Sequence, residues 1–161
     1  MGETSWTERA LEPFGMEIEI DLNSAWPADF TRRMLALFDE HKLLVFRGQS
    51  LDEAAQVRVL EHFGRVLGSH GEYRKISSDG ALGSGPLTWH SDLAFTEEPF
   101  KVISLHAVAV NDGQSWTAFA NGVETARTLP ASMQERLSDL QAVTTISTIQ
   151  KREYVEKRDV E

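Results

Sequence analysis

The 161-residue sequence contains no cysteine, so neither a disulfide framework nor a thiolate metal site can form. Any metal ion bound by this chain must therefore take nitrogen and oxygen ligands. No run of 18 apolar residues occurs, and the N-terminus lacks a basic segment followed by an apolar stretch. These absences argue against a membrane span and a secretory signal, and we expect a cytoplasmic protein with no membrane partner.

Basic residues are also scarce. The chain contains 16 lysines and arginines but 25 aspartates and glutamates, so its net charge is −9. This acidic balance, without a basic stripe, argues against a nucleic-acid partner. An apolar content of 41% is typical of a globular protein rather than a disordered one. At this length we expect a single domain that covers residues 1–161.

The hydrophobic pattern of the first half predicts strands and helices in alternation. Residues 1–12 are mostly polar, and we expect no regular structure there. Residues 14–22 alternate in a way typical of a half-buried strand, whose inward face carries Met16, Ile18, Ile20 and Leu22. Residues 27–41 predict a helix with one apolar stripe, formed by Phe30, Met34, Leu37 and Phe38. The apolar run 43–46 indicates a buried strand that the turn at residues 47–48 ends.

The next helix is predicted from a capping box, with Ser50 as the N-cap and Glu53 as the residue that reaches back to it. Its expected apolar stripe contains Ala54, Val57, Leu60 and Phe63. Residues 68–86 hold five glycines and four serines, and an irregular stretch of that length in a compact domain is often functional.

The second half predicts more strands. Residues 100–110 carry apolar side chains on both faces, which is typical of a strand buried between layers, and residues 116–119 predict another short strand. Pro130 suits the first turn of a helix that runs through Met133, Leu137 and Leu140. The β-branched residues of 144–149 favour a further strand.

The clearest chemical candidate is His90-Ser91-Asp92, in a run that we interpret as extended. In a strand the side chains of residues i and i+2 project to the same face, so His90 and Asp92 could reach one metal ion. With a second histidine supplied from elsewhere they would form the 2-His-1-carboxylate triad that holds Fe(II). The alternative is an ordinary pair at the edge of a loop, because His-x-Asp is a common sequence.

The other candidates are less distinctive. Structural roles are expected for His41, His62 and His106, which lie in or beside predicted helices and strands. His70 lies in the long irregular stretch three residues before Tyr73, and a surface role and a functional role are equally open for it.

Three features of the sequence resemble one enzyme family in the same order along the chain. The first is HKLLVFRGQ at residues 41–49, followed by a helix that ends in Phe63-Gly64. The second is WHSDLAF at residues 89–95. The third is GQSWTAFAN at residues 113–121, followed by Leu129-Pro130. Together they resemble the taurine dioxygenase family of Fe(II)- and 2-oxoglutarate-dependent oxygenases over residues 12–142.

The resemblance implies an α+β fold built on a double-stranded β-helix, or jelly roll, with helices packed outside. It makes His90 and Asp92 the first two iron ligands, and it makes Thr117 the residue that hydrogen-bonds a carboxylate of 2-oxoglutarate. It assigns His70 and Tyr73 to the substrate. The implied reaction is the oxidation, such as hydroxylation, of a small organic molecule by O₂, with Fe(II) and 2-oxoglutarate required. A homo-oligomer is compatible with this interpretation.

The sequence departs from the family pattern in two respects. The family usually has Gly-Gly-Asp-Thr where this chain has Gln114-Ser115-Trp116-Thr117. The family's second histidine ligand and its 2-oxoglutarate-binding arginine lie far downstream, and no histidine follows His106 here. We therefore expect the N-terminal part of such an oxygenase domain, which would bind Fe(II) weakly when isolated. The alternative is a catalytically inactive jelly-roll remnant with a binding or oligomerisation role.

Overall fold

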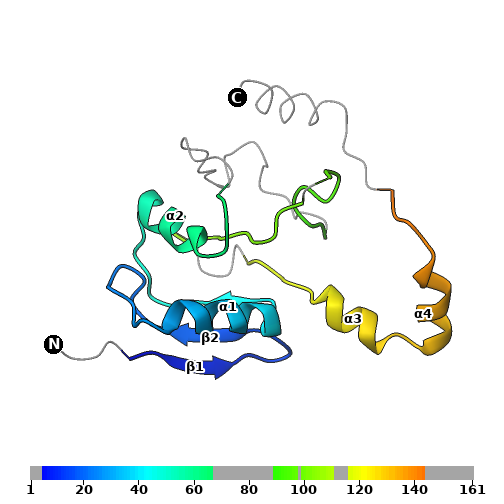
Figure 1. Cartoon of the computed structure of the whole chain (residues 1–161), viewed down its shortest axis with the longest axis horizontal. Coiled ribbons are helices and arrows are strands. Elements are labelled where there is room, and N and C mark those ends of the chain that lie inside the picture. Colours follow the sequence, from blue (N-terminus) through cyan, green and yellow to red (C-terminus); the bar gives the residue numbers. More distant parts are fainter. Residues whose placement is uncertain (1–4, 67–88, 98, 111–115, 144–161) are drawn as a thin grey trace, which may run out of the picture. The chain divides into compact units, whose positions relative to one another are not determined.

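The computed structural model describes residues 5–66, 89–97, 99–110 and 116–143 (Figure 1). The chain divides into two compact units, of which the first is Met1–Ile76 with Ser104–Arg127 and the second is Ser77–Ile103 with Thr128–Glu161. The described elements follow the order β1, β2, α1, β3, α2, α3 and α4, so the chain is α+β. No helix among the described residues is long and apolar enough to cross a membrane.

A three-stranded sheet in the first unit has the order β1-β2-β3. The edge strand β1 (Thr7–Ala10) is antiparallel to β2 (Met16–Glu19), and β3 (Leu44–Val45) is parallel to β2. The predicted strand at 14–22 is confirmed in β2, and so is its inward face, since all four of its predicted members are buried: Met16, Ile18, Ile20 and Leu22. The predicted strand at 43–46 is confirmed as β3, although its two residues are half-buried rather than buried.

The strand β1 shows that the expected lack of structure in residues 1–12 was wrong. The charged side chains of β1 form ion pairs with neighbouring elements. Such pairs cannot be predicted from the spacing of apolar residues, on which the expectation was based. Glu8 accepts hydrogen bonds from Arg33 of α1 at 2.9 and 2.6 Å. Glu17 of β2 pairs with Arg9 of β1 at 2.9 Å and with Arg47 at 3.0 Å.

These ion pairs predict how stability depends on pH. The hydrogen bonds from Arg33 hold the pKa of Glu8 below its ordinary value of 4.5. A carboxylate whose pKa is lowered by folding stabilises the protein above its unfolded pKa, and that contribution is lost as the pH falls through the folded pKa. We expect the urea midpoint of Glu8→Gln to fall less than that of the wild type between about pH 5 and about pH 3. Glu12→Gln, a change at an exposed site, should lose as much of its urea midpoint as the wild type over this pH range. If the midpoint fell equally with pH in all three proteins, the Glu8–Arg33 pair would not contribute to the pH dependence of stability.

Helix α1 (Phe30–His41) covers the sheet, and its buried residues Phe30, Met34 and Leu37 follow helical spacing (Figure 1). The predicted stripe is therefore confirmed for these three residues, whereas its fourth member, Phe38, is half-buried. The helix begins at Phe30 rather than at Pro27. The core of the first unit consists of the buried residues of β2 and α1 together with Ile20, Leu22 and Val59. The indole rings of Trp6 and Trp26 pack edge-on against Phe30, with ring centroids 5.2 and 5.1 Å away.

Helix α2 (Glu53–Glu61) is where the sequence predicts, but two details of that prediction were wrong. Its N-cap is Asp52, whose carboxylate accepts the Ala55 N–H at 2.7 Å, and not Ser50. The buried side chains are Ala55, Gln56 and Val59. Apolar residues occur on two adjacent faces of this helix, so periodicity alone does not distinguish them.

The second half forms fewer strands than predicted. Neither 100–110 nor 116–119 is a strand, and residues 122–128 form an unpredicted helix, α3 (Gly122–Thr128). The helix predicted from Pro130 is confirmed as α4 (Ala131–Ser138), but Pro130 is its N-cap residue rather than part of its first turn, and Leu140 lies beyond its end. A strand requires a neighbour with which to exchange backbone hydrogen bonds, and among the described residues only β1, β2 and β3 pair. The strand predicted at 144–149 lies outside the described residues.

Candidate active site

The segment that carries the His-x-Asp sequence is a series of turns rather than the extended strand that we expected. The Ala94 N–H donates to the carbonyl oxygen of Ser91 at 3.3 Å, and the Thr96 N–H donates to that of Leu93 at 2.9 Å. Leu93 is buried and has a positive φ of 52°. The backbone turns at Leu93, which buries this apolar side chain. We expected His90 and Asp92 to share one face of a strand, and that prediction was wrong.

The two predicted ligands nevertheless lie together. The Nε2 atom of His90 is 3.0 Å from the Oδ1 atom of Asp92, and both side chains are about half exposed. Two ligand atoms about 2.1 Å from one ion and at right angles to each other are about 3.0 Å apart. The observed separation fits adjacent ligands of an octahedral ion. It also fits a hydrogen bond in which a protonated Nε2 donates to the carboxylate.

Nitrogen and carboxylate oxygen are donors that suit Fe(II). A complete protein site is not seen, because the described residues contain no group of three or more histidine, aspartate or glutamate side chains placed to hold a metal. The described part of the chain thus offers two ligands of the expected three.

Of the other predicted site residues, the structure describes only Thr117. Thr117 lies in the first unit, in an irregular segment with exposed side chains, whereas His90 and Asp92 belong to the second unit. His70 and Tyr73 lie outside the described residues. The structure therefore brings together the pair of predicted metal ligands and leaves the remaining assignments as predictions.

The three remaining histidines make the kind of contact expected of structural residues. His41 Nε2 lies 3.8 Å from a carboxylate oxygen of its neighbour Glu40. The ring of His62 lies against Trp26, with centroids 4.7 Å apart. His106 Nε2 lies 3.3 Å from the carbonyl oxygen of Gln49.

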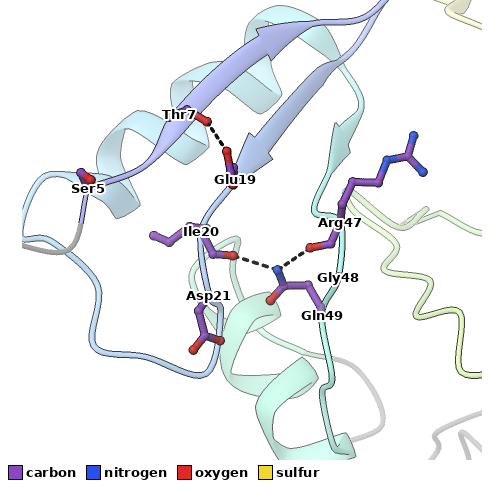
Figure 2. Close-up of a pocket in the computed structure, with 8 residues that line it drawn as sticks. All are labelled: Ser5, Thr7, Glu19, Ile20, Asp21, Arg47, Gly48 and Gln49. Carbon is purple, nitrogen blue, oxygen red and sulfur yellow. Dashed lines mark hydrogen bonds between the residues drawn. The ribbon is translucent and has the colours of Figure 1, made fainter.

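An open pocket of about 470 Å³ lies in the first unit, where β1, the end of β2 and the segment after β3 meet (Figure 2). Its described lining consists of Ser5, Thr7, Glu19, Ile20, Asp21, Arg47, Gly48 and Gln49. None of these is a predicted site residue.

Two polar side chains of this pocket, those of Gln49 and Thr7, bond to other residues of its lining. The Gln49 amide donates to the carbonyl oxygens of Ile20 at 2.8 Å and Arg47 at 2.9 Å, and the Thr7 hydroxyl donates to Glu19 at 3.0 Å (Figure 2). Apart from the place of Gln49 in the motif at 41–49, nothing in the sequence indicates that its side chain joins the end of β2 to the segment after β3. We assign this pocket a structural role.

Comparison with known proteins gives one family and two relatives. Residues 7–160 match the model of the "Taurine catabolism dioxygenase TauD, TfdA family". The chain is 26% identical over 149 residues to the alpha-ketoglutarate-dependent 2,4-dichlorophenoxyacetate dioxygenase of Cupriavidus pinatubonensis (strain JMP 134 / LMG 1197), an alignment that covers 77% of this chain and 52% of the relative.

The second relative is the alpha-ketoglutarate-dependent sulfate ester dioxygenase of Pseudomonas putida. The chain is 29% identical to it over 140 residues, which cover 80% of this chain and 44% of the relative. The chain thus spans about half the length of these curated relatives. No solved structure matches the chain significantly.

Proposed function

The chain belongs to the taurine catabolism dioxygenase TauD, TfdA family, and from this premise we propose that it forms part of an Fe(II)- and 2-oxoglutarate-dependent dioxygenase that oxidises a small organic substrate. The observation that carries this proposal is the 3.0 Å approach of His90 Nε2 to Asp92 Oδ1. Both relatives are named as alpha-ketoglutarate-dependent dioxygenases, which supports the same cosubstrate here.

Each residue has a defined role in this proposal. The neutral imidazole of His90 and the carboxylate of Asp92 would supply two adjacent ligands to Fe(II), and a residue outside the described ones would supply the third. The hydroxyl of Thr117 would donate a hydrogen bond to a carboxylate of 2-oxoglutarate. His70 and Tyr73 would contact the substrate. When bound, Fe(II) and 2-oxoglutarate supply the oxidising chemistry with O₂, and the protein orients the reacting groups.

The proposal extends to the architecture. We propose that residues 1–161 are the N-terminal portion of a single oxygenase domain of jelly-roll type with helices packed outside. The observed α+β content and the family membership support this arrangement. A cytoplasmic location and a homo-oligomer stay predictions.

Anaerobic titration tests the proposed function. Adding Fe(II) and then 2-oxoglutarate to the chain should produce a broad visible charge-transfer band, because the 2-oxo acid chelates the iron. Succinate lacks the 2-oxo group and should give no band, which makes it the matched control. If the folded protein produces no band at saturating iron and cosubstrate, the proposal is wrong.

The second candidate is a catalytically inactive remnant with a binding or oligomerisation role. The observation that favours it is the lack of a third ligand beside His90 and Asp92 among the described residues. In that case circular dichroism would show a folded protein, whereas the iron titration would show no saturable binding.

A further inference from the structure

A second open pocket, of about 390 Å³, lies in the first unit, where the segment after β2, the start of α1 and the end of α2 meet. Its described lining contains no aspartate or glutamate, although the chain carries 25 of them. The pocket of Figure 2, by contrast, is lined by Glu19 and Asp21. Arg58 is the one permanently charged group in the described lining of the second pocket, so this pocket favours an anion.

The same pocket presents apolar and aromatic surface. Leu22 and Val59 line it and are buried, with 8% and 9% of their surfaces exposed. The indole of Trp26 and the imidazole of His62 also line it, and their ring centroids lie 4.7 Å apart with 35° between the ring planes. Such surface favours a ligand with an apolar part, which leaves water when it covers these rings.

The turn that forms one side of the pocket is held by hydrogen bonds of its own. The backbone N–H of Asn23 donates to Asp21 Oδ1 at 2.9 Å, and its side-chain amide donates to the Ser50 carbonyl oxygen at 3.0 Å. The Ser24 hydroxyl donates to the Asp21 carbonyl oxygen at 2.7 Å. This side of the pocket therefore exists before a ligand binds, which lowers the entropy cost of binding.

Two donor groups in the lining have no acceptor in the described part of the chain. The Nε1–H group of Trp26 is buried without a hydrogen-bond partner. Arg58 forms no ion pair within the same residues, whereas four other arginines pair with glutamates: Arg9, Arg33, Arg47 and Arg127. A purely structural role for Arg58 would be to stabilise the end of α2, since it lies in the last turn of that helix.

We propose that this pocket binds a small organic carboxylate. The carboxylate group lies beside the planar guanidinium of Arg58, which can donate two parallel hydrogen bonds to it, and the apolar part lies against Trp26 and His62. The volume of about 390 Å³ is in the range of small-molecule sites, roughly 300–1,000 Å³. The described lining contains no residue that we assign to iron, 2-oxoglutarate or substrate, so the inference is independent of the proposed function.

Titration of the iron-free chain with benzoate, followed by NMR of the indole N–H groups, tests the proposal. Benzoate should shift the Trp26 resonance saturably, and the loss of one peak in Trp26→Phe identifies that resonance. Benzamide has the same ring but no charge, and it should bind at least about tenfold more weakly. Leaving out iron keeps carboxylate binding at the proposed metal site out of the measurement.

Variants of Arg58 separate ligand binding from a structural role. Arg58→Gln should lower the benzoate affinity about tenfold, because it removes a charged donor. Arg58→Lys keeps the charge but not the planar pair of donors, and it should lower the affinity about threefold. The matched control is Arg136→Gln, which removes the same charge from the last turn of α4 and should bind benzoate like the wild type.

Several results would overturn the proposal. They are the lack of a saturable shift of the Trp26 resonance in the wild type, equal affinities for benzoate and benzamide, and an unchanged benzoate affinity in Arg58→Gln. An equal loss of affinity in Arg58→Gln and Arg136→Gln would show an effect of net charge alone and would also overturn it. None of these results bears on the iron and 2-oxoglutarate titration, which tests the proposed function separately.

Discussion

Replacing Asp92 by alanine is expected to reduce the affinity for Fe(II) by more than the roughly 10- to 100-fold that follows loss of an outer-shell partner. The reason is that Asp92 supplies the anionic oxygen of the proposed pair, 3.0 Å from the imidazole nitrogen of His90. With only two candidate ligands in the described residues, the variant keeps one of them. Anaerobic Fe(II) titration, followed by calorimetry, would measure the change.

The matched control for Asp92→Ala is Glu97→Gln. It removes one negative charge from an exposed residue of the same segment, so it reports what the loss of net charge alone does to iron affinity. We expect Glu97→Gln to bind Fe(II) like the wild type and Asp92→Asn to be impaired, because asparagine keeps the shape but loses the charge. If Asp92→Ala bound Fe(II) as tightly as the wild type, Asp92 would not be an iron ligand.

Replacing Phe30 by alanine is expected to lower the free energy of unfolding by about 3–5 kcal/mol. Phe30 is fully buried at the start of α1, between the rings of Trp6 and Trp26. Its loss leaves a cavity in the core and removes two edge-on aromatic contacts. Urea unfolding followed by tryptophan fluorescence and circular dichroism would measure the effect.

The same chemical change at Phe119 is the control for Phe30→Ala. Phe119 is 51% exposed, so Phe119→Ala should cost less than about 1 kcal/mol. If the two variants lost equal stability, the core would not be centred on β2 and α1.

In the first unit, the sequence predicts well the elements whose buried side chains recur with the period of a strand or a helix. Ile18 in β2 and Met34 in α1 lie on apolar faces with the periods of a strand and a helix, and both are completely buried. The prediction of a strand at 100–110 was wrong, because a strand also needs a neighbouring strand to which it can hydrogen-bond. The pattern within one segment does not show whether such a neighbour exists. Leu105, for example, fits a buried strand in sequence but is 57% exposed.

The candidate site could be predicted only in part. His90 and Asp92 do approach each other, but a turn around the buried Leu93 accompanies this approach rather than the expected strand. The burial of Gln56 in α2 could not be predicted from the sequence either, because hydrophobic periodicity treats an amide as an interruption of the apolar face. Family membership came from motif order and is confirmed, whereas the substrate depends on residues such as His70 that lie outside the described ones.

The most direct test is anaerobic soaking of Fe(II) into crystals of the protein, with diffraction data collected on both sides of the iron absorption edge. The account predicts an anomalous peak between the imidazole of His90 and the carboxylate of Asp92, within about 2.3 Å of both ligand atoms. An iron peak elsewhere, or no peak between these two side chains at saturating Fe(II), would contradict it.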